Sequence, residues 1–306
     1  MFVFILRRLA QAVPVLLGVL VIAFLVTRFT PGDPARIMAG AEASEIAVQA
    51  MRERLGLDQP GYVQFFLYLG RVLQGDLGSS YHLGRDVVSL LQDALPRTAS
   101  LAVIALIVTA SVGIPTGIVS AIRKDTWWDA LARFGALLGV SIPAFFAGLL
   151  MILLFSYYLG WFPSYGSGSI RHVILPGITL GLFSTGLVAR LTRASMLDIM
   201  GQDYVRTGRA KGLGERIVIF KHALRNASIS IVTIMGLQLG SLLSGSVLTE
   251  TVFAYPGIGR LLVRSIFERD YPVVQGVILL IALIYLIANL LVDITYAAVD
   301  PRIRYS

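Results

Sequence analysis

The chain has 306 residues, of which 56% are hydrophobic and only 14% are charged, and its mean hydropathy is +0.76. A soluble domain of this length would lack the polar residues needed to cover its surface. The composition therefore excludes an ordinary soluble enzyme and predicts an all-α integral membrane protein. The chain has no cysteine, which excludes disulfides and thiolate metal sites.

Six apolar segments are long enough to cross a bilayer, for which a helix needs about 20 mostly apolar residues. They comprise residues 9–29, 99–122, 134–159, 174–191, 229–248 and 273–297. The first follows Arg7 and Arg8 as a secretory signal would, but it is longer than a usual signal core. We expect it to be a retained transmembrane helix. Pro143 in the third segment is expected to kink its helix, because proline removes an internal hydrogen bond.

The distribution of Lys and Arg predicts which side of the membrane each loop occupies, since cytoplasmic loops carry the excess. With six spans, one side holds Arg7, Arg8, Arg123, Lys124, residues 190–225 and the C-terminal arginines Arg302 and Arg304. Residues 190–225 carry eight basic residues against three acids, whereas residues 33–93 carry eight acids against five arginines. We therefore expect both termini in the cytoplasm. The net charge of +8 is mainly an orientation signal and does not indicate nucleic-acid binding.

The external segment, residues 30–95, begins with the turn-forming residues Pro31-Gly32-Asp33-Pro34. Helical spacing follows over residues 42–55, and residues 62–73 are aromatic and amphipathic, as in a helix on a membrane surface. The segment fits a small cap packed on the helices, and it also fits a contact surface for an external partner.

The loop between the fourth and fifth spans is the most informative part of the sequence. Its pattern predicts a helix ending at Lys211, a turn at residues 212–214 and a second helix from Glu215. Glycine suits such a corner because it accepts positive φ. From charge alone, a basic hairpin resting on anionic lipid is an equally good interpretation.

The same loop, from Asp203 to Asn226, resembles the cytoplasmic EAA loop of ABC-importer permeases, in the form found in the dipeptide, oligopeptide and nickel branch. The resembling stretch reads Asp-Tyr-Val-Arg-Thr-Gly-Arg-Ala-Lys-Gly-Leu, followed by Phe-Lys-His-Ala-Leu-Arg-Asn. Gly208 departs from the family's usual alanine. Residues 31–35, 250–261 and 293–305 match the same branch, so the resemblance covers the whole chain. Within the branch the chain looks most like the glutathione-type permease.

This resemblance implies the type I importer permease fold, with six transmembrane helices. It divides the chain into an N-terminal transmembrane helix (1–29), a periplasmic segment (30–95), a five-helix core (96–297) that includes a cytoplasmic coupling loop (192–227), and a cytoplasmic tail (298–306). It also implies a multi-pass location in the bacterial inner membrane. The implied partners are a second permease, two cytoplasmic ATPase subunits, a periplasmic or lipid-anchored solute-binding protein and membrane lipid.

The chain itself is expected to be a transport subunit rather than an enzyme and to bind no cofactor. It lacks the Gly-x-x-x-x-Gly-Lys-Ser/Thr phosphate loop, and the resemblance assigns ATP and magnesium to the partner subunits. The resemblance also implies that the hairpin docks on the ATPase. We expect its contact face to comprise Tyr204, Arg209, Ala210, Lys211, Gly212 and Leu213.

The solute pathway is harder to locate from the sequence. Gln238, Ser241 and Gly245 recur at helical spacing in the fifth span, and Ser141 lies in the third. These small and polar residues are candidates to line the pathway, but they fit close helix packing equally well.

Two other classes of membrane protein fit the sequence less well: a stand-alone secondary transporter or channel, and an intramembrane enzyme. The first needs an ionisable site at mid-membrane, for which the sequence offers no good candidate. Against the second, the three histidines all lie outside the spans, and no Gly-x-Ser-x-Gly element is present. We expect an ATP-driven importer of short peptides, with glutathione or a nickel complex as the alternative solute.

Overall fold

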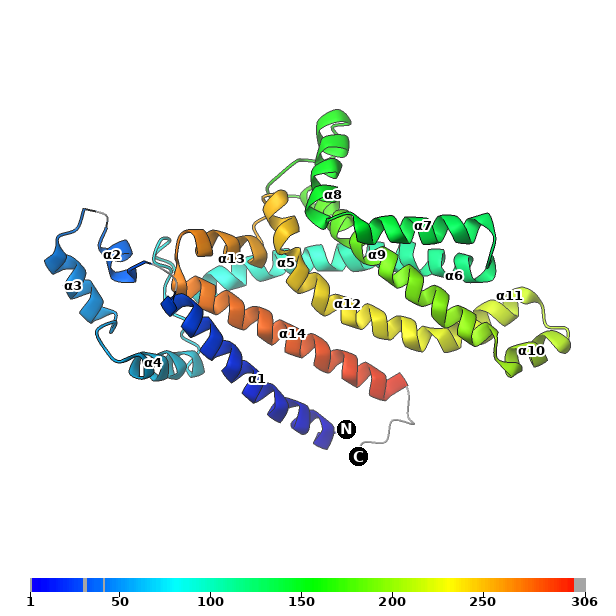
Figure 1. Ribbon diagram of the computed structural model, residues 1–306, viewed down its shortest axis with the longest axis horizontal. Coiled ribbons are helices and arrows are strands. Elements are labelled where there is room, and N and C mark those ends of the chain that lie inside the picture. Colours follow the sequence, from blue (N-terminus) through cyan, green and yellow to red (C-terminus); the bar gives the residue numbers. More distant parts are fainter. Residues whose placement is uncertain (1, 30–31, 41, 300–306) are drawn as a thin grey trace. The chain divides into compact units, whose positions relative to one another are not determined.

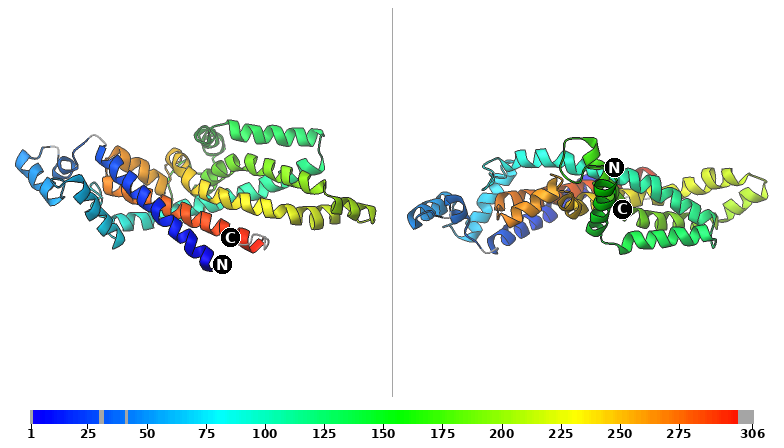
Figure 2. Two further views of the ribbon diagram at one scale, coloured as in Figure 1. Left: turned by 60° about the horizontal axis from the view of Figure 1, so that its bottom comes forward. Right: turned by 90° about the horizontal axis from the view of Figure 1, so that it is seen from above.

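The computed structural model describes residues 2–29, 32–40 and 42–299. Its regular structure is helical over these ranges, apart from one isolated antiparallel bridge between Ser79 and Asp86. The chain divides into two compact units, one formed by residues 1–98 and 256–286 and the other by residues 99–255 and 287–306. Figures 1 and 2 show the helices in three orientations.

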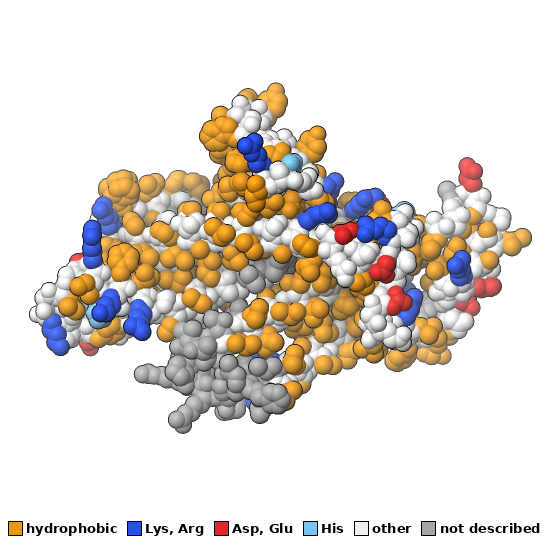
Figure 3. All heavy atoms as spheres, turned by 180° about the vertical axis from the view of Figure 1, so that it is seen from behind, with side chains coloured by type: hydrophobic (Ala, Val, Ile, Leu, Met, Phe, Trp, Pro, Cys, Tyr) orange, Lys and Arg blue, Asp and Glu red, His pale blue; other side chains and the backbone are white. Residues whose placement is uncertain are grey.

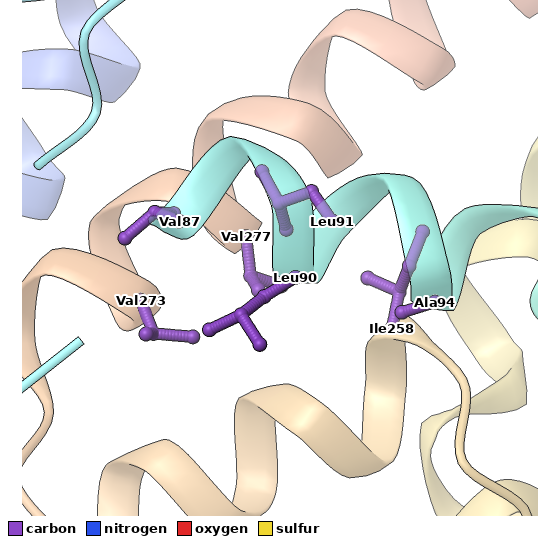
Figure 4. Close-up of a cluster of buried hydrophobic side chains, with 7 residues drawn as sticks. All are labelled: Val87, Leu90, Leu91, Ala94, Ile258, Val273 and Val277. Carbon is purple, nitrogen blue, oxygen red and sulfur yellow. The ribbon is translucent and has the colours of Figure 1, made fainter. Parts of the chain in front are cut away.

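The first unit contains the N-terminal helix, the short helices after it, and two helices from near the C-terminus. Its elements are α1 (Phe2–Phe29), α2 (Pro34–Ala39), α3 (Glu45–Arg54), α4 (Gly61–Leu73), the start of α5 (Val87–Val108), α13 (Ile258–Phe267) and most of α14 (Tyr271–Val299). The helices α3 and α4 confirm the two helices predicted at residues 42–55 and 62–73. The core of this unit joins α5, α13 and α14 (Figure 4), and it consists of Val87, Leu90, Leu91, Ala94, Ile258, Val273 and Val277.

Hydrogen bonds to two carboxylates, those of Asp33 and Asp270, order the loops of this unit. Asp33 caps α2 by accepting the Ala35 N–H (3.0 Å), and it also accepts a bond from Arg52 of α3 (2.6 Å). Asp270, which is buried, accepts the hydroxyl of Ser80 and the backbone N–H of Tyr81 (3.1 Å). Because a buried carboxylate needs such donors, these bonds order the loop before α5.

The second unit is built around α9. Its elements are the rest of α5, the π-helical turn η1 (Thr109–Gly113), α6 (Ile114–Ile122), α7 (Trp127–Ser141), α8 (Ala144–Met151), η2 (Ile152–Tyr158), α9 (Ile170–Met200), α10 (Asp203–Ala210), α11 (Glu215–Ile217), η3 (Val218–Ala223), α12 (Leu224–Val252) and the end of α14. The helix α9 packs against α6, α7, α8 and α12.

Glycines make these crossings close. A Cβ at Gly117 of α6 would lie 2.6 Å from the Ala189 carbonyl oxygen of α9, and one at Gly186 would lie 2.6 Å from that of Ala136. Such small-residue contacts hold helices together in a lipid environment.

The predicted spans are reproduced with one main correction. By length and composition, five helical stretches of the described residues could cross a membrane: Leu6–Phe29, Val87–Ile122, Ile170–Met200, Glu215–Leu242 and Tyr271–Leu291. The third predicted span, residues 134–159, is not one straight helix, because α7 ends at Ser141 and the following helix leaves at 101°. The described residues offer a sixth span only if this bent pair is counted as one. Pro143 stands at this break as the N-cap of α8, so it divides the helix rather than merely kinking it.

The boundaries also differ from the expected ones. The second span begins at Val87 rather than at residue 99, and α9 and α12 extend beyond the predicted residues 174–191 and 229–248. Helices continue past the apolar residues because polar side chains at their ends do not break backbone hydrogen bonding. Pro31 and residues 300–306, with Arg302 and Arg304, lie outside the described residues.

Candidate functional site

The helix α10, the turn after it and α11 form a hairpin that projects past the ends of α9 and α12 (Figures 1 and 2). It begins where α9 ends at Met200, with Gly201 as the C-cap and Gln202 as the N-cap of α10. The observed helix, turn and second helix confirm the pattern predicted for this loop. Figure 3 shows Lys and Arg side chains gathered over this part of the second unit.

The turn depends on Gly212. Its φ is +79°, a left-handed conformation that residues with a Cβ rarely adopt. The Gly212 N–H donates to the Arg209 carbonyl (2.9 Å), and the Leu213 N–H donates to that of Gly208 (3.3 Å). These bonds end α10 in the way glycine-based C-caps do.

An ion pair closes the turn on its side-chain face. Arg209 donates to both carboxylate oxygens of Glu215, at 3.2 Å from Nε and 2.7 Å from Nη2. The hydrogen bond to this carboxylate raises the pKa of Arg209 above its ordinary value. A bidentate pair of this geometry fixes the relative orientation of the two groups, so α10 and α11 are joined by a clamp as well as by the backbone.

The base of the hairpin is anchored in the protein. Val205 of α10 and Val218 of η3 are both buried, and these two elements pack together. Behind them is an apolar cluster that α6, α9, η3 and α12 share, made of Ile118, Ala121, Met196, Ile219, Ala223, Ala227 and Ile231. The hairpin is therefore attached through buried apolar contacts to the helices that make up this cluster.

All six residues predicted for the contact face lie on the hairpin. Ala210 and Lys211 are exposed, the Tyr204 side chain is 45% exposed, and Leu213 is 38% exposed. Tyr204 is held in place because its hydroxyl accepts a bond from Asn226 Nδ2 (2.9 Å), which also donates to the His222 carbonyl (2.8 Å). The hairpin thus presents an ordered mixture of apolar and basic groups to its surroundings.

Sequence reasoning missed two residues that position this face, Glu215 and Asn226. Both lie within the stretch on which the resemblance rests. The spacing of Arg209 and Glu215, on either side of a glycine turn, was a usable signal for the clamp. The bond between Tyr204 and Asn226 crosses from α10 to α12 and had no such local signal.

A buried ion pair joins the start of α7, which follows the basic loop of Arg123 and Lys124, to the α9 helix that leads into the hairpin. Asp129, at the start of α7, accepts Nε and Nη2 of Arg193 on α9, both at 2.8 Å, and the Ser120 hydroxyl at 2.5 Å. This pair holds the loop of Arg123 and Lys124 beside the part of α9 that leads into the hairpin. The two basic segments predicted to share one side of the membrane therefore lie at the same end of this unit.

The candidate pathway residues are dispersed. Gln238 is buried and Ser241 is exposed, both on α12, while Ser141 is exposed at the end of α7. The surroundings of Gly245 fall outside what the structure describes. A groove of about 710 Å³ in the second unit is lined by neither Ser141, Gln238 nor Ser241.

Comparison with known proteins identifies the family. Residues 113–305 match the model of the "Binding-protein-dependent transport system inner membrane component", and residues 1–102 match that of its N-terminal region. The glutathione transport system permease protein GsiC of Escherichia coli O6:H1 (strain CFT073) is 45% identical over 302 residues, or 99% of each chain. The "Putative peptide transport system permease protein BAB2_1050" of Brucella abortus (strain 2308) is 46% identical over 309 residues, or 98% of each.

Solved structures agree at the level of the fold. A chain of the inward-facing MetNI methionine ABC transporter aligns with a TM-score of 0.61 at 18% identity, covering 70% of this chain and 97% of its own. A chain of an amino acid ABC transporter aligns at 0.52 and 16%, covering 71% and 95%. The relatives are transport permeases rather than enzymes, and the predicted resemblance is confirmed. The chain belongs to the family of binding-protein-dependent transport system inner membrane components.

Proposed function

We propose that this chain is one permease subunit of an ATP-driven importer that carries short peptides across the bacterial inner membrane. It forms the pathway with a second permease, receives solute from a binding protein outside, and couples to ATPase subunits through the hairpin around Gly212. Both termini and the hairpin lie in the cytoplasm in this arrangement. The observation that carries the proposal is the basic, partly apolar hairpin, closed by the Arg209–Glu215 pair, at the end of a bundle of membrane-length helices.

The hairpin has the mechanical properties that coupling requires. An element that transmits the rigid-body motion of a partner must resist bending and must be fixed to the parts that move. The Arg209–Glu215 pair and the Gly212 turn supply the stiffness. The buried Val205 and the apolar cluster behind η3 supply the attachment to the helices.

The solute class rests on the relatives. Those at 45–46% identity over nearly the whole chain are named for glutathione or for peptides, and glutathione is itself a tripeptide. A small peptide is therefore the solute that both names share, and we take glutathione as the first one to test.

Co-purification tests the assembly. The tagged chain is isolated from its own host, its partners are identified by mass spectrometry, and ATP hydrolysis is measured. Recovery of a second permease together with ATP-hydrolysing subunits is expected. Recovery of this chain alone, active in transport without ATP, would support a stand-alone secondary transporter instead.

A further inference from the structure

A deep apolar groove of about 710 Å³ lies between η1, α6, α7, α8 and α9, on the second unit. Its walls are aliphatic, aromatic and glycine residues, among them Leu131, Gly135, Gly139, Leu150 and Phe183. The hydroxyls of Thr179 and Thr185, which also line it, donate to carbonyls of their own helix at 2.9 and 2.8 Å. Since these polar groups already have partners, the groove favours an apolar occupant.

The break at Pro143 creates this groove. The helix α7 runs beside α9 as far as Ser141, and α8 then turns away, so that the two helix pieces meet at 101°. A Cβ added to Gly135 would meet no atom within 4 Å, because that helix face borders open space. The groove is therefore a wedge that the chain's own side chains leave unfilled.

One end of the groove is basic. A shallow dent of only about 10 Å³ shares Thr116, Ala132, Ala136 and Ala189 with the groove and brings Arg133, Arg190 and Arg193 to its edge. Arg193 is neutralised by the buried Asp129, whose carboxylate lies 3.6 Å from Arg133. Among the described residues no acidic side chain lies within ion-pair distance of Arg190. The three arginines therefore outnumber the carboxylates of Asp129 and Asp125, which both act on Arg193.

Two further features of this end are typical of a membrane interface. Trp128 lines the groove and stacks on Trp127, and the Arg123 guanidinium lies 5.5 Å from the Trp128 ring. Tryptophan side chains concentrate at the level of lipid headgroups, and basic pockets between transmembrane helices bind anionic headgroups.

We propose that this groove is a binding site for one anionic phospholipid, with its phosphate at Arg133 and Arg190 and an acyl chain in the wedge between α7, α8 and α9. A zwitterionic lipid or an apolar helix of another protein would also fill the wedge. Neither would bring a net negative charge to Arg133 and Arg190. The chemistry of the site, two arginines at one end of an apolar groove, matches the two parts of an anionic lipid. The site is separate from the coupling hairpin.

The test uses the quenching of tryptophan fluorescence by lipids brominated on the acyl chain. The chain has three tryptophans, so the variant W127F/W161F retains Trp128 alone. The full-length variant is placed in phosphatidylcholine bilayers that contain either brominated phosphatidylglycerol or brominated phosphatidylcholine at the same mole fraction. Phosphatidylglycerol should quench Trp128 with the higher apparent affinity, by roughly 25-fold if each arginine contributes about fivefold.

Two variants separate the headgroup from the acyl chain. Arg133→Gln with Arg190→Gln should remove the preference for phosphatidylglycerol, while Arg54→Gln with Arg171→Gln, which loses the same charge from exposed positions elsewhere, should keep it. Gly135→Leu places a side chain in the wedge and should reduce quenching by both lipids. Equal quenching by the two lipids in the starting variant, or an unchanged preference after loss of Arg133 and Arg190, would overturn the proposal.

The assembled transporter gives the second readout. Lipid extracted from the complex purified in detergent should contain about one phosphatidylglycerol or cardiolipin per copy of this chain, and the R133Q/R190Q complex should lose it. If the complex retains no anionic lipid although the isolated chain binds it, the groove is a protein interface and the proposal is wrong for the assembled protein.

Discussion

Replacing Gly212 by Asp and, separately, by Asn distinguishes two demands on the hairpin: that its turn can form, and that its surface fits a partner. Gly212 has φ of +79°, and a Cβ there would meet nothing within 4 Å. A substitution therefore costs only backbone strain, about 1–2 kcal/mol for a general residue and less for Asn and Asp, which visit this conformation most readily. The two side chains have the same shape and differ in charge.

The expected magnitudes differ between folding and coupling. Because the turn is exposed and flanked by the basic residues Arg209 and Lys211, the charge of Asp should change the free energy of unfolding by no more than about 0.5 kcal/mol relative to Asn. In a docked interface the carboxylate is desolvated without a designed partner, which costs several kcal/mol. A loss of about 3 kcal/mol would weaken docking roughly 150-fold.

The assay compares membrane abundance, thermal stability in detergent and uptake of labelled glutathione for the wild-type, G212N and G212D transporters. Both variants should reach the membrane at similar levels, G212N should retain most of its uptake, and G212D should lose it. Full uptake by G212D would refute the coupling role of this turn. If G212N were as inactive as G212D, the loss of uptake would come from the backbone conformation that only glycine adopts there, and not from the charge of the side chain.

Three further predictions concern stability, each measured as the free energy of unfolding in detergent. Gly208→Ala should stabilise α10 by up to about 1 kcal/mol, because a Cβ there makes only an ordinary contact of 3.5 Å; destabilisation would show that the glycine is needed for packing. Gly186→Ala should destabilise by about 1–3 kcal/mol through its clash with the α7 backbone, while Gly135→Ala should not; equal effects would contradict the close crossing. Asp129→Ala should lower the free energy of unfolding by about 3 kcal/mol, because it leaves the partly buried Arg193 unpaired. Loss of the exposed Asp203 should lower it by under about 1 kcal/mol. A neutral result for Asp129→Ala would show that the pair does not stabilise the fold.

Much of the fold follows from local features of the sequence. Long apolar runs specify the spans, because the bilayer core offers no hydrogen-bond partner to backbone polar groups. Gly212 and Gly214 specify the corner of the hairpin. The break at Pro143 was only partly predictable. A proline within a span predicts a bend, but the 101° angle depends on how α7 and α8 pack against α9.

The contacts that position the candidate site were less accessible from the sequence. The six residues of the hairpin face could be named in advance from a continuous motif. The bonds of Tyr204 to Asn226 and of Asp129 to Arg193 join residues 22 and 64 positions apart. Such pairs are set by helix crossings, and one sequence without its packing does not specify which of several polar groups will meet.

The most direct test of the account measures uptake into proteoliposomes that contain the purified assembly. Labelled glutathione and its binding protein are supplied on the side opposite the hairpin, with ATP or a non-hydrolysable analogue on the hairpin side. The account predicts accumulation only with hydrolysable ATP, and none when this chain is reconstituted alone. Accumulation by the chain alone, without ATP, would contradict the account.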